Sequence, residues 1–156
     1  MEKTDRELLI KEISSRLPYG IKVQVFGWDE EKGEVAVPLK VYSINTDGYI
    51  SLDYNHYDVE SVYIEDCLLY LRPMSSMTEE EKKEFQSFFP GCFGDQWLDI
   101  EEGIIEIFEC SSTMTLYLYD FERMIDWLNA HHFDYRGLIE KGLAIEVTKE
   151  NNPYKE

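Results

Sequence analysis

The chain has 156 residues and a formal net charge of -17, from 32 acidic and 15 basic side chains. Hydrophobic residues make up 44% of it and aromatic residues 14%, which is enough to fill a core at this length. The sequence therefore predicts a folded acidic protein. It argues against direct nucleic-acid binding and against attraction to an anionic membrane, since both need clusters of Lys and Arg.

The N-terminal half of the chain predicts one helix followed by four strands. The sequence Thr4-Asp5-Arg6-Glu7 is a capping box, which indicates a helix that begins there and runs to about Leu17. The four strands are short segments in which apolar residues alternate with polar ones or gather in one run: 21–28, 34–44, 49–53 and 61–71. Pro38 indicates an edge position or a bulge in the second strand. Asp47-Gly48 supplies the positive φ of a tight turn before the third strand.

The middle of the chain predicts a helix and two further strands. A second capping box, Thr78-Glu79-Glu80-Glu81, begins a helix that Pro90-Gly91 ends. Its three glutamates suit the positive end of the helix dipole. An irregular loop over 91–103 is predicted next, and after it come the strands 104–109 and 113–119.

The strongest helical period in the chain follows Asp120, which is the predicted cap of a helix that ends near His131. Its apolar residues recur at positions i, i+3, i+4 and i+7: Phe121, Met124, Ile125 and Leu128. Beyond it, Asp134 is the predicted cap of a short helical turn over 135–141, which Gly142 closes.

This order of elements predicts an α+β fold. We expect a single domain, with a mostly antiparallel sheet of about five to seven strands and about three to four helices packed on it. The domain is assigned to residues 1–147, and residues 148–156 are expected to form a polar, frayed tail. The charged N-terminus lacks a signal region and no stretch approaches the roughly 20 apolar residues that span a bilayer, so we expect a soluble cytoplasmic protein. Three widely spaced cysteines are typical of reduced thiols: Cys67, Cys92 and Cys110.

Two adjacent histidines near the end of the third predicted helix are candidate metal ligands. His131 and His132 have Asp126 and Asp134 nearby in the sequence. Adjacent residues on a helix point about 100° apart, so both histidines rarely reach one ion. An imidazole at a helix C-terminus also complements the helix dipole. The structural interpretation is favoured, and we predict no catalytic residue and no cofactor or metal, with His131, His132 and Asp134 as the weak candidates.

Two long stretches of the chain, 41–71 and 84–122, contain no Lys or Arg. The carboxylates of these stretches repel one another in the folded chain, and their negative field attracts a cation or a basic partner. The first stretch also holds six tyrosines. Tyrosine suits a half-buried strand, and it is also enriched in protein interfaces. The predicted binding residues are tyrosines and carboxylates of both stretches: Tyr49, Asp53, Tyr54, Tyr57, Asp58, Glu106, Glu109, Tyr117 and Tyr119.

Three segments carry a resemblance to a known group of proteins. They are residues 127–144 (WLNAHHFDYRGLIEKGLA), 17–20 (LPYG) and 71–81 (LRPMSSMTEEE). On these segments the chain resembles small acidic proteins encoded by prophages and other mobile elements of gut bacteria. The resemblance implies a bacterial cytoplasm and an accessory role for a mobile element. It implies no activity and no catalytic residue.

The sequence thus favours a non-catalytic protein that recognises a basic protein surface through an acidic, tyrosine-bearing face. A sharper alternative is an acidic mimic whose carboxylates occupy the nucleic-acid groove of a host protein in place of phosphates. A second alternative is a metal-assisted hydrolase that uses His131 or His132, and a third is a structural or assembly component of a phage. The oligomeric state stays open.

Overall fold

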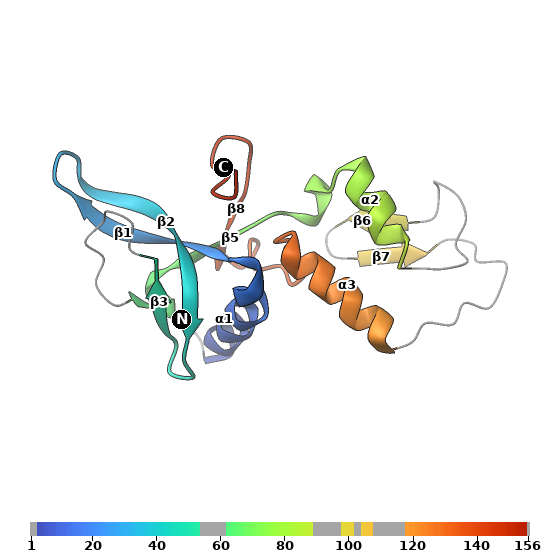
Figure 1. The fold of residues 1–156 in the computed structure, drawn as a ribbon, viewed down its shortest axis with the longest axis horizontal. Helices are drawn as coiled ribbons and strands as arrows, with labels where there is room; N and C mark the ends of the chain where they lie inside the picture. Colours follow the sequence, from blue (N-terminus) through green and yellow to red (C-terminus); the bar gives the residue numbers. More distant parts are fainter. Residues whose placement is uncertain (1–2, 54–61, 89–97, 102–103, 108–117, 156) are drawn as a thin grey trace. The chain divides into compact units, whose positions relative to one another are not determined.

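The computed structural model describes residues 3–53, 62–88, 98–101, 104–107 and 118–155 (Figure 1). The chain divides into two compact units. One, the sheet unit, comprises Met1–Leu71 and Leu138–Glu156, and the other, the helical unit, comprises Arg72–Gly137. The predicted α+β fold is confirmed, with three α-helices and a curled, mostly antiparallel sheet of six strands among the described residues. The predicted domain boundary at residue 147 stays a prediction.

The sheet unit is built on six strands in the order β4-β3-β2-β1-β5-β8. Their bounds are β1 (Lys22–Asp29), β2 (Gly33–Ile44), β3 (Tyr49–Leu52), β4 (Val62–Tyr63), β5 (Leu68–Leu71) and β8 (Ala144–Glu146). All neighbours are antiparallel except β5 and β8, which are parallel. The segment 61–71 holds two strands instead of the one predicted, because the short 3-10 helix η2 (Ile64–Asp66) separates them.

The longest strands, β1 and β2, form a hairpin whose turn is held by Asp29. Its carboxylate oxygen Oδ1 accepts hydrogen bonds from the backbone N–H groups of Glu31 and Lys32, both at 3.0 Å. β5 pairs with β1 only at Val23 and Gln24, and β3 pairs with β2 only from residue 41 onward. Within the described residues, the turn end of the hairpin is therefore a two-stranded ribbon that runs beyond α1 (Lys3–Arg16) (Figure 1).

Helix α1 covers the inner face of the sheet. Leu9 and Ile13 are buried there against strand residues such as Val23 and Val41. The helix includes Thr4 within its first turn, so the predicted capping box at Thr4 does not mark the helix start. The neighbouring Glu12 and Arg16 are fully buried as an ion pair, with Arg16 Nε donating to Glu12 Oε1 at 2.7 Å.

The C-terminal segment returns to the sheet unit, and two predictions for it are wrong. Residues 135–141 form turns in place of the predicted helical turn, and Ala144–Glu146 then forms β8 beside β5. The tail does not fray at Tyr154, whose hydroxyl donates to the backbone oxygen of Tyr70 at 2.8 Å and accepts from the N–H of Lys22 at 3.2 Å. Pairing with β5 is a non-local contact, which the local sequence pattern does not contain.

The helical unit contains α2 (Glu79–Gln86), β6 (Leu98–Glu101), β7 (Ile104–Ile107) and α3 (Leu118–Ala130). The capping box at Thr78 is confirmed in both of its hydrogen bonds. Two predictions are wrong: β6 lies inside the predicted loop 91–103, and Tyr119 belongs to α3 instead of a strand. Of the four apolar residues in the helical period of α3, Phe121 and Ile125 are exposed. The buried cluster of this unit consists of Met74, Met77, Phe85, Met124, Trp127, Leu128 and Phe133.

In the described part of the chain, no helix combines the length and the apolar character that crossing a bilayer requires.

Candidate protein-binding surface

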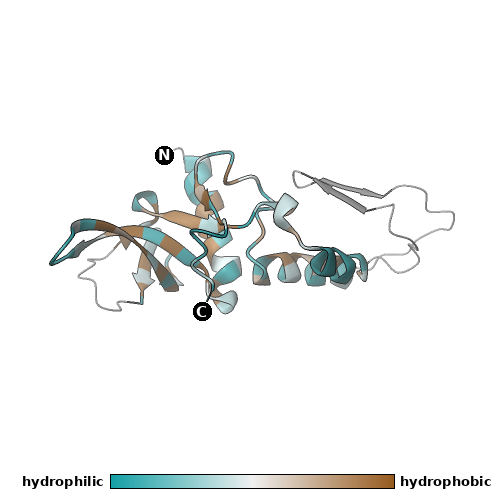
Figure 2. Ribbon diagram, turned by 90° about the horizontal axis from the view of Figure 1, so that it is seen from above, coloured by the Kyte–Doolittle hydropathy of each residue, from teal (hydrophilic) through white to brown (hydrophobic). Residues whose placement is uncertain are grey.

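The side of the sheet opposite α1, the outer face, carries exposed aromatic side chains. Successive strand residues point to opposite faces. In β1, Val23 and Val25 are buried on the inner face, whereas Phe26 and Trp28 are 62% and 64% exposed on the outer one. Figure 2 shows hydrophobic and hydrophilic bands along the long hairpin. An antiparallel sheet with one solvated face usually presents polar residues there, so exposed rings are a feature to explain.

Three tyrosines lie farther along the outer face, on β2, β3 and β4, and one carboxylate follows the end of β3. We call Tyr42, Tyr49, Asp53 and Tyr63 the tyrosine patch. Tyr49 and Tyr63 are directly opposite each other in neighbouring strands, with ring centroids 5.7 Å apart in an edge-to-face arrangement. Tyr42 is 59% exposed and Tyr63 52%. Edge-to-face contact fixes the orientation of rings that remain accessible to a partner.

Asp53 interacts with one tyrosine of the patch, Tyr42. Its backbone N–H donates to the backbone oxygen of Lys40 at 2.9 Å, which fixes Asp53 beside β2. The hydrogen bond between the Asp53 carboxylate and the Tyr42 hydroxyl raises the pKa of that hydroxyl. Lys40 lies with its ammonium 5.9 Å from the centroid of the Tyr42 ring. Tyr42 thus has a carboxylate at its hydroxyl and a cation near its ring, and its exposed surface can still bury against a protein.

The structure brings together only part of the predicted binding set. Tyr49 and Asp53 lie in the tyrosine patch, whereas Tyr119 is exposed on α3 of the helical unit. The remaining predicted positions lie outside the residues whose side chains the structure describes: Tyr54, Tyr57, Asp58, Glu106, Glu109 and Tyr117. The prediction that both acidic stretches form one face stays a prediction.

Sequence reasoning missed two aromatic residues of the outer face. Strand alternation already places Phe26 on the side of Lys22 and Gln24, and Trp28 follows by the same period. Tyr70, one of the six clustered tyrosines, is instead buried, and its hydroxyl donates to Gln24 Oε1 at 3.1 Å. The periodicity was therefore a better guide to this surface than the clustering of tyrosines.

The histidine pair occupies a stacked, partly buried position in the helical unit. His131 Nδ1 lies 2.9 Å from the backbone oxygen of Trp127, and its ring stacks on the Trp127 indole with centroids 4.0 Å apart. His132 is buried and has the left-handed backbone angle φ 58°, which turns the chain away from the helix. Asp134 donates its N–H to the oxygen of Arg72. Among the described residues, no three His, Cys, Asp or Glu side chains gather as a metal site.

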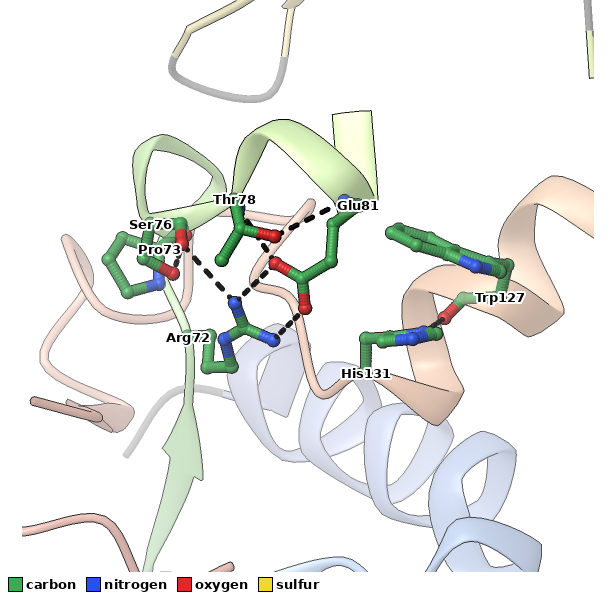
Figure 3. A network of polar contacts seen from close by, with 7 residues as sticks. All are labelled: Arg72, Pro73, Ser76, Thr78, Glu81, Trp127 and His131. Carbon is green, nitrogen blue, oxygen red and sulfur yellow. Dashed lines mark hydrogen bonds and ion pairs between the residues drawn. The ribbon is translucent and has the colours of Figure 1, made fainter. Parts of the chain in front are cut away.

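The polar network beside this stack holds the helical unit together (Figure 3). Arg72 donates from Nη1 and Nη2 to the two carboxylate oxygens of Glu81 at 2.7 and 2.8 Å, and its guanidinium lies 4.2 Å from the Phe133 ring centroid. Hydrogen bonding from Arg72 lowers the pKa of Glu81 to about 2. Because Glu81 also completes the capping box of α2, one carboxylate fixes both the helix start and the Arg72 side chain. Arg136 donates from Nη2 to the Tyr135 hydroxyl at 3.1 Å.

Cys67 is buried in the sheet unit, and its thiol lies 3.4 Å from the backbone oxygen of Ile64. Burial raises the pKa of this thiol to about 12. A thiol with so high a pKa is a poor nucleophile at neutral pH. Cys92 and Cys110 lie outside the described residues.

Comparison with protein-family models, with curated proteins and with solved structures finds no match to this chain.

Proposed function

We propose that this chain is a non-catalytic protein-binding module, and that the tyrosine patch on its outer face recognises a basic protein surface. The observation that carries the proposal is the exposure of the Tyr42 and Tyr63 rings, together with the Asp53 carboxylate at the Tyr42 hydroxyl. Tyrosine buries a large area with few rotatable bonds, and for that reason it is frequent in interfaces.

Charge supports a basic partner. The sheet unit has 18 acidic and 10 basic side chains, a net charge of -8, and the helical unit has 14 and 5, a net charge of -9. Both units therefore contribute to a field that attracts cationic surfaces and accelerates their association. The resemblance of residues 127–144 adds the setting of this proposal, an accessory protein of a bacterial mobile element.

The experiment is partner capture from a bacterial lysate followed by affinity measurement on the captured protein. We compare the natural chain with a variant in which Tyr42 and Tyr63 are both replaced by Ser. A matched control carries Phe121→Ser, which removes an exposed ring from α3 in the helical unit. The proposal expects a basic protein that the control retains and that the patch variant binds at least about tenfold more weakly, the loss typical of interface anchors.

Salt dependence sharpens the result. A partner held by opposite charges binds more weakly as ionic strength rises, because exposed charges are screened over about 10 Å at 0.1 M salt. Partners lost equally from the patch variant and the control would contradict the assignment of the patch. A partner bound through its own nucleic-acid groove would favour the acidic mimic.

A further inference from the structure

We propose that this protein self-associates into a two-fold symmetric dimer by pairing the open edge of β1, residues 25–29, with the same edge of a second copy. The proposal rests on the hairpin at the turn end of the sheet unit and is independent of the tyrosine patch. It assigns a role to Phe26 and Trp28, the exposed rings that the proposed function leaves unused.

The backbone of β1 has hydrogen-bonding groups that face this edge. In an antiparallel ladder, alternate residues bond to the neighbouring strand. The backbone oxygen of Ile21 accepts a hydrogen bond from the N–H of Val41. The N–H and C=O groups of the odd-numbered residues of β1 therefore face β2, and those of the even-numbered residues face away from it. The N–H of Lys22 faces away, as its hydrogen bond to Tyr154 on the β5 side shows. The N–H and C=O groups of Phe26 and Trp28 therefore point to the open edge.

Within the described residues, no strand covers this edge beyond Gln24. β5 begins at Leu68, opposite Gln24, and η2 lies before it in the chain. The open edge thus runs from Val25 to Asp29, where the turn begins. Residues 25–29 of a second copy are long enough to pair along this edge, and the turn of that copy begins only where β5 starts.

The two edges of the hairpin differ in a way that selects β1. On β2, the backbone groups of Pro38 and Lys40 face away from β1, because the Lys40 oxygen accepts its hydrogen bond from Asp53. Proline and lysine are residues that protect an edge from pairing. On β1, the edge-facing residues Phe26 and Trp28 flank Gly27, and the segment 25–28 contains neither charge nor proline.

Self-pairing about Gly27 is complementary in both backbone and side chains. With a two-fold axis at Gly27, Phe26 lies opposite Trp28 of the second copy, and both residues present edge-facing N–H and C=O groups. Directly opposite side chains in antiparallel strands have Cβ atoms about 4.5–5.5 Å apart on one face. Each Phe26 therefore meets a Trp28 on the outer face, and aromatic cross-strand pairs of this kind stabilise sheets.

The interface is small, so the dimer is weak and reversible. From the area that a Phe or Trp side chain buries, the exposed parts of the four rings amount to about 400–600 Å², well below the roughly 1,600 Å² of a standard interface. The net charge of -17 on each copy adds repulsion. Salt screens that repulsion, so the dimer is expected to tighten with salt, the opposite of binding to a basic partner.

The test is sedimentation of the full chain at concentrations from about 10 µM to about 1 mM, in about 50 mM and about 500 mM NaCl. We expect a monomer–dimer equilibrium whose dissociation constant falls at high salt. Trp28→Ala should raise that constant at least about tenfold, and Phe26→Pro should raise it further than Phe26→Ala, since proline also removes the edge-facing N–H. Tyr42→Ala, which removes an equally exposed ring away from the edge, is the matched control and should leave it unchanged.

Amide hydrogen exchange of the unsubstituted protein supplies a readout that needs no variant. The amides of Phe26 and Trp28 should become protected at high concentration, whereas the amide of Ala36, which faces away from β1 on the other side of the hairpin, should not. A chain that stays monomeric at about 1 mM in high salt overturns the proposal. So does a dimer weakened by Tyr42→Ala as much as by Trp28→Ala. Protection of the β1 edge by a co-purified protein in a monomeric chain would assign the edge to a foreign strand and equally overturn it.

Discussion

The buried Glu12–Arg16 pair predicts a large and asymmetric response to mutation. Both side chains are 0% exposed in α1, and they are joined at 2.7 Å. Replacing Arg16 by Met leaves the Glu12 carboxylate buried without its counter-charge. Removing one partner of a buried pair costs about 3–5 kcal/mol. Since domains are stable by only about 5–15 kcal/mol, this single change should remove a large part of the stability.

The double variant Glu12→Leu with Arg16→Met should behave differently from the single one. It removes both charges and leaves apolar side chains against the neighbouring core residues Leu9 and Ile13. Such replacements of a buried pair are often neutral or stabilising by about 1–4 kcal/mol, because the desolvation of both ions is also removed. We therefore expect the double variant to recover most of the stability that Arg16→Met loses.

The measurement is urea unfolding followed by far-ultraviolet circular dichroism, with thermal unfolding as a second probe. Arg16→Met should lower Tm by about 6–20 °C. The same helix offers a matched control, the exposed pair Lys3–Glu7 at 3.8 Å, whose side chains are 90% and 67% exposed. Lys3→Met should change the free energy of unfolding by less than about 0.5 kcal/mol. Equal effects of Arg16→Met and Lys3→Met, or a double variant as unstable as the single one, would refute the reasoning.

Two further predictions follow from the helical unit. The pKa of Glu81 falls from its ordinary 4.5 to about 2 on folding. Its ionised carboxylate therefore contributes fully to the free energy of unfolding above pH 4.5, and this contribution is lost as the pH falls toward 2. Glu81→Gln should lower the free energy of unfolding by about 1–3 kcal/mol at neutral pH and make Tm depend less steeply on pH between 4.5 and 2. An unchanged slope of Tm against pH would contradict the role of the Arg72–Glu81 pair. Because the His131 ring stacks on Trp127 and its Nδ1 lies 2.9 Å from the Trp127 backbone oxygen, His131→Ala should leave the zinc and manganese content of the protein unchanged in elemental analysis; metal that disappears in this variant would favour the hydrolase instead.

Local patterns predicted the elements whose stabilising contacts are themselves local. The alternation over 21–28 and 34–44 predicted β1 and β2, and Thr78-Glu79-Glu80-Glu81 predicted the start of α2, since a capping box is closed by residues three apart. β8 has three residues and exists by pairing with β5, which lies about 75 residues earlier in the chain. A pattern of that length contains no period, so the sequence gives no sign of it.

Burial was harder to predict than structure type. Along α3, the helical period predicts a stripe of apolar residues, but it does not determine which residues of that stripe face the core. Trp127 is buried, and Phe121 and Ile125 are left exposed. In α1, Glu12–Arg16 and Lys3–Glu7 are both opposite charges spaced i, i+4, the pattern of ordinary surface pairs. Only the position of the helix on the sheet, a tertiary property, makes one of them part of the core.

The two proposals for the outer face make opposite predictions about ionic strength, and this separates them in one titration. The tyrosine patch is proposed to meet opposite charge, so salt should weaken its complex. The β1 edge is proposed to meet its own copy, so salt should strengthen that one. Both follow from one property of the sheet: α1 covers its inner face, while four aromatic side chains on its outer face stay more than half exposed, namely Phe26, Trp28, Tyr42 and Tyr63. Exposed rings in such number on one face are typical of surfaces that bury against a protein.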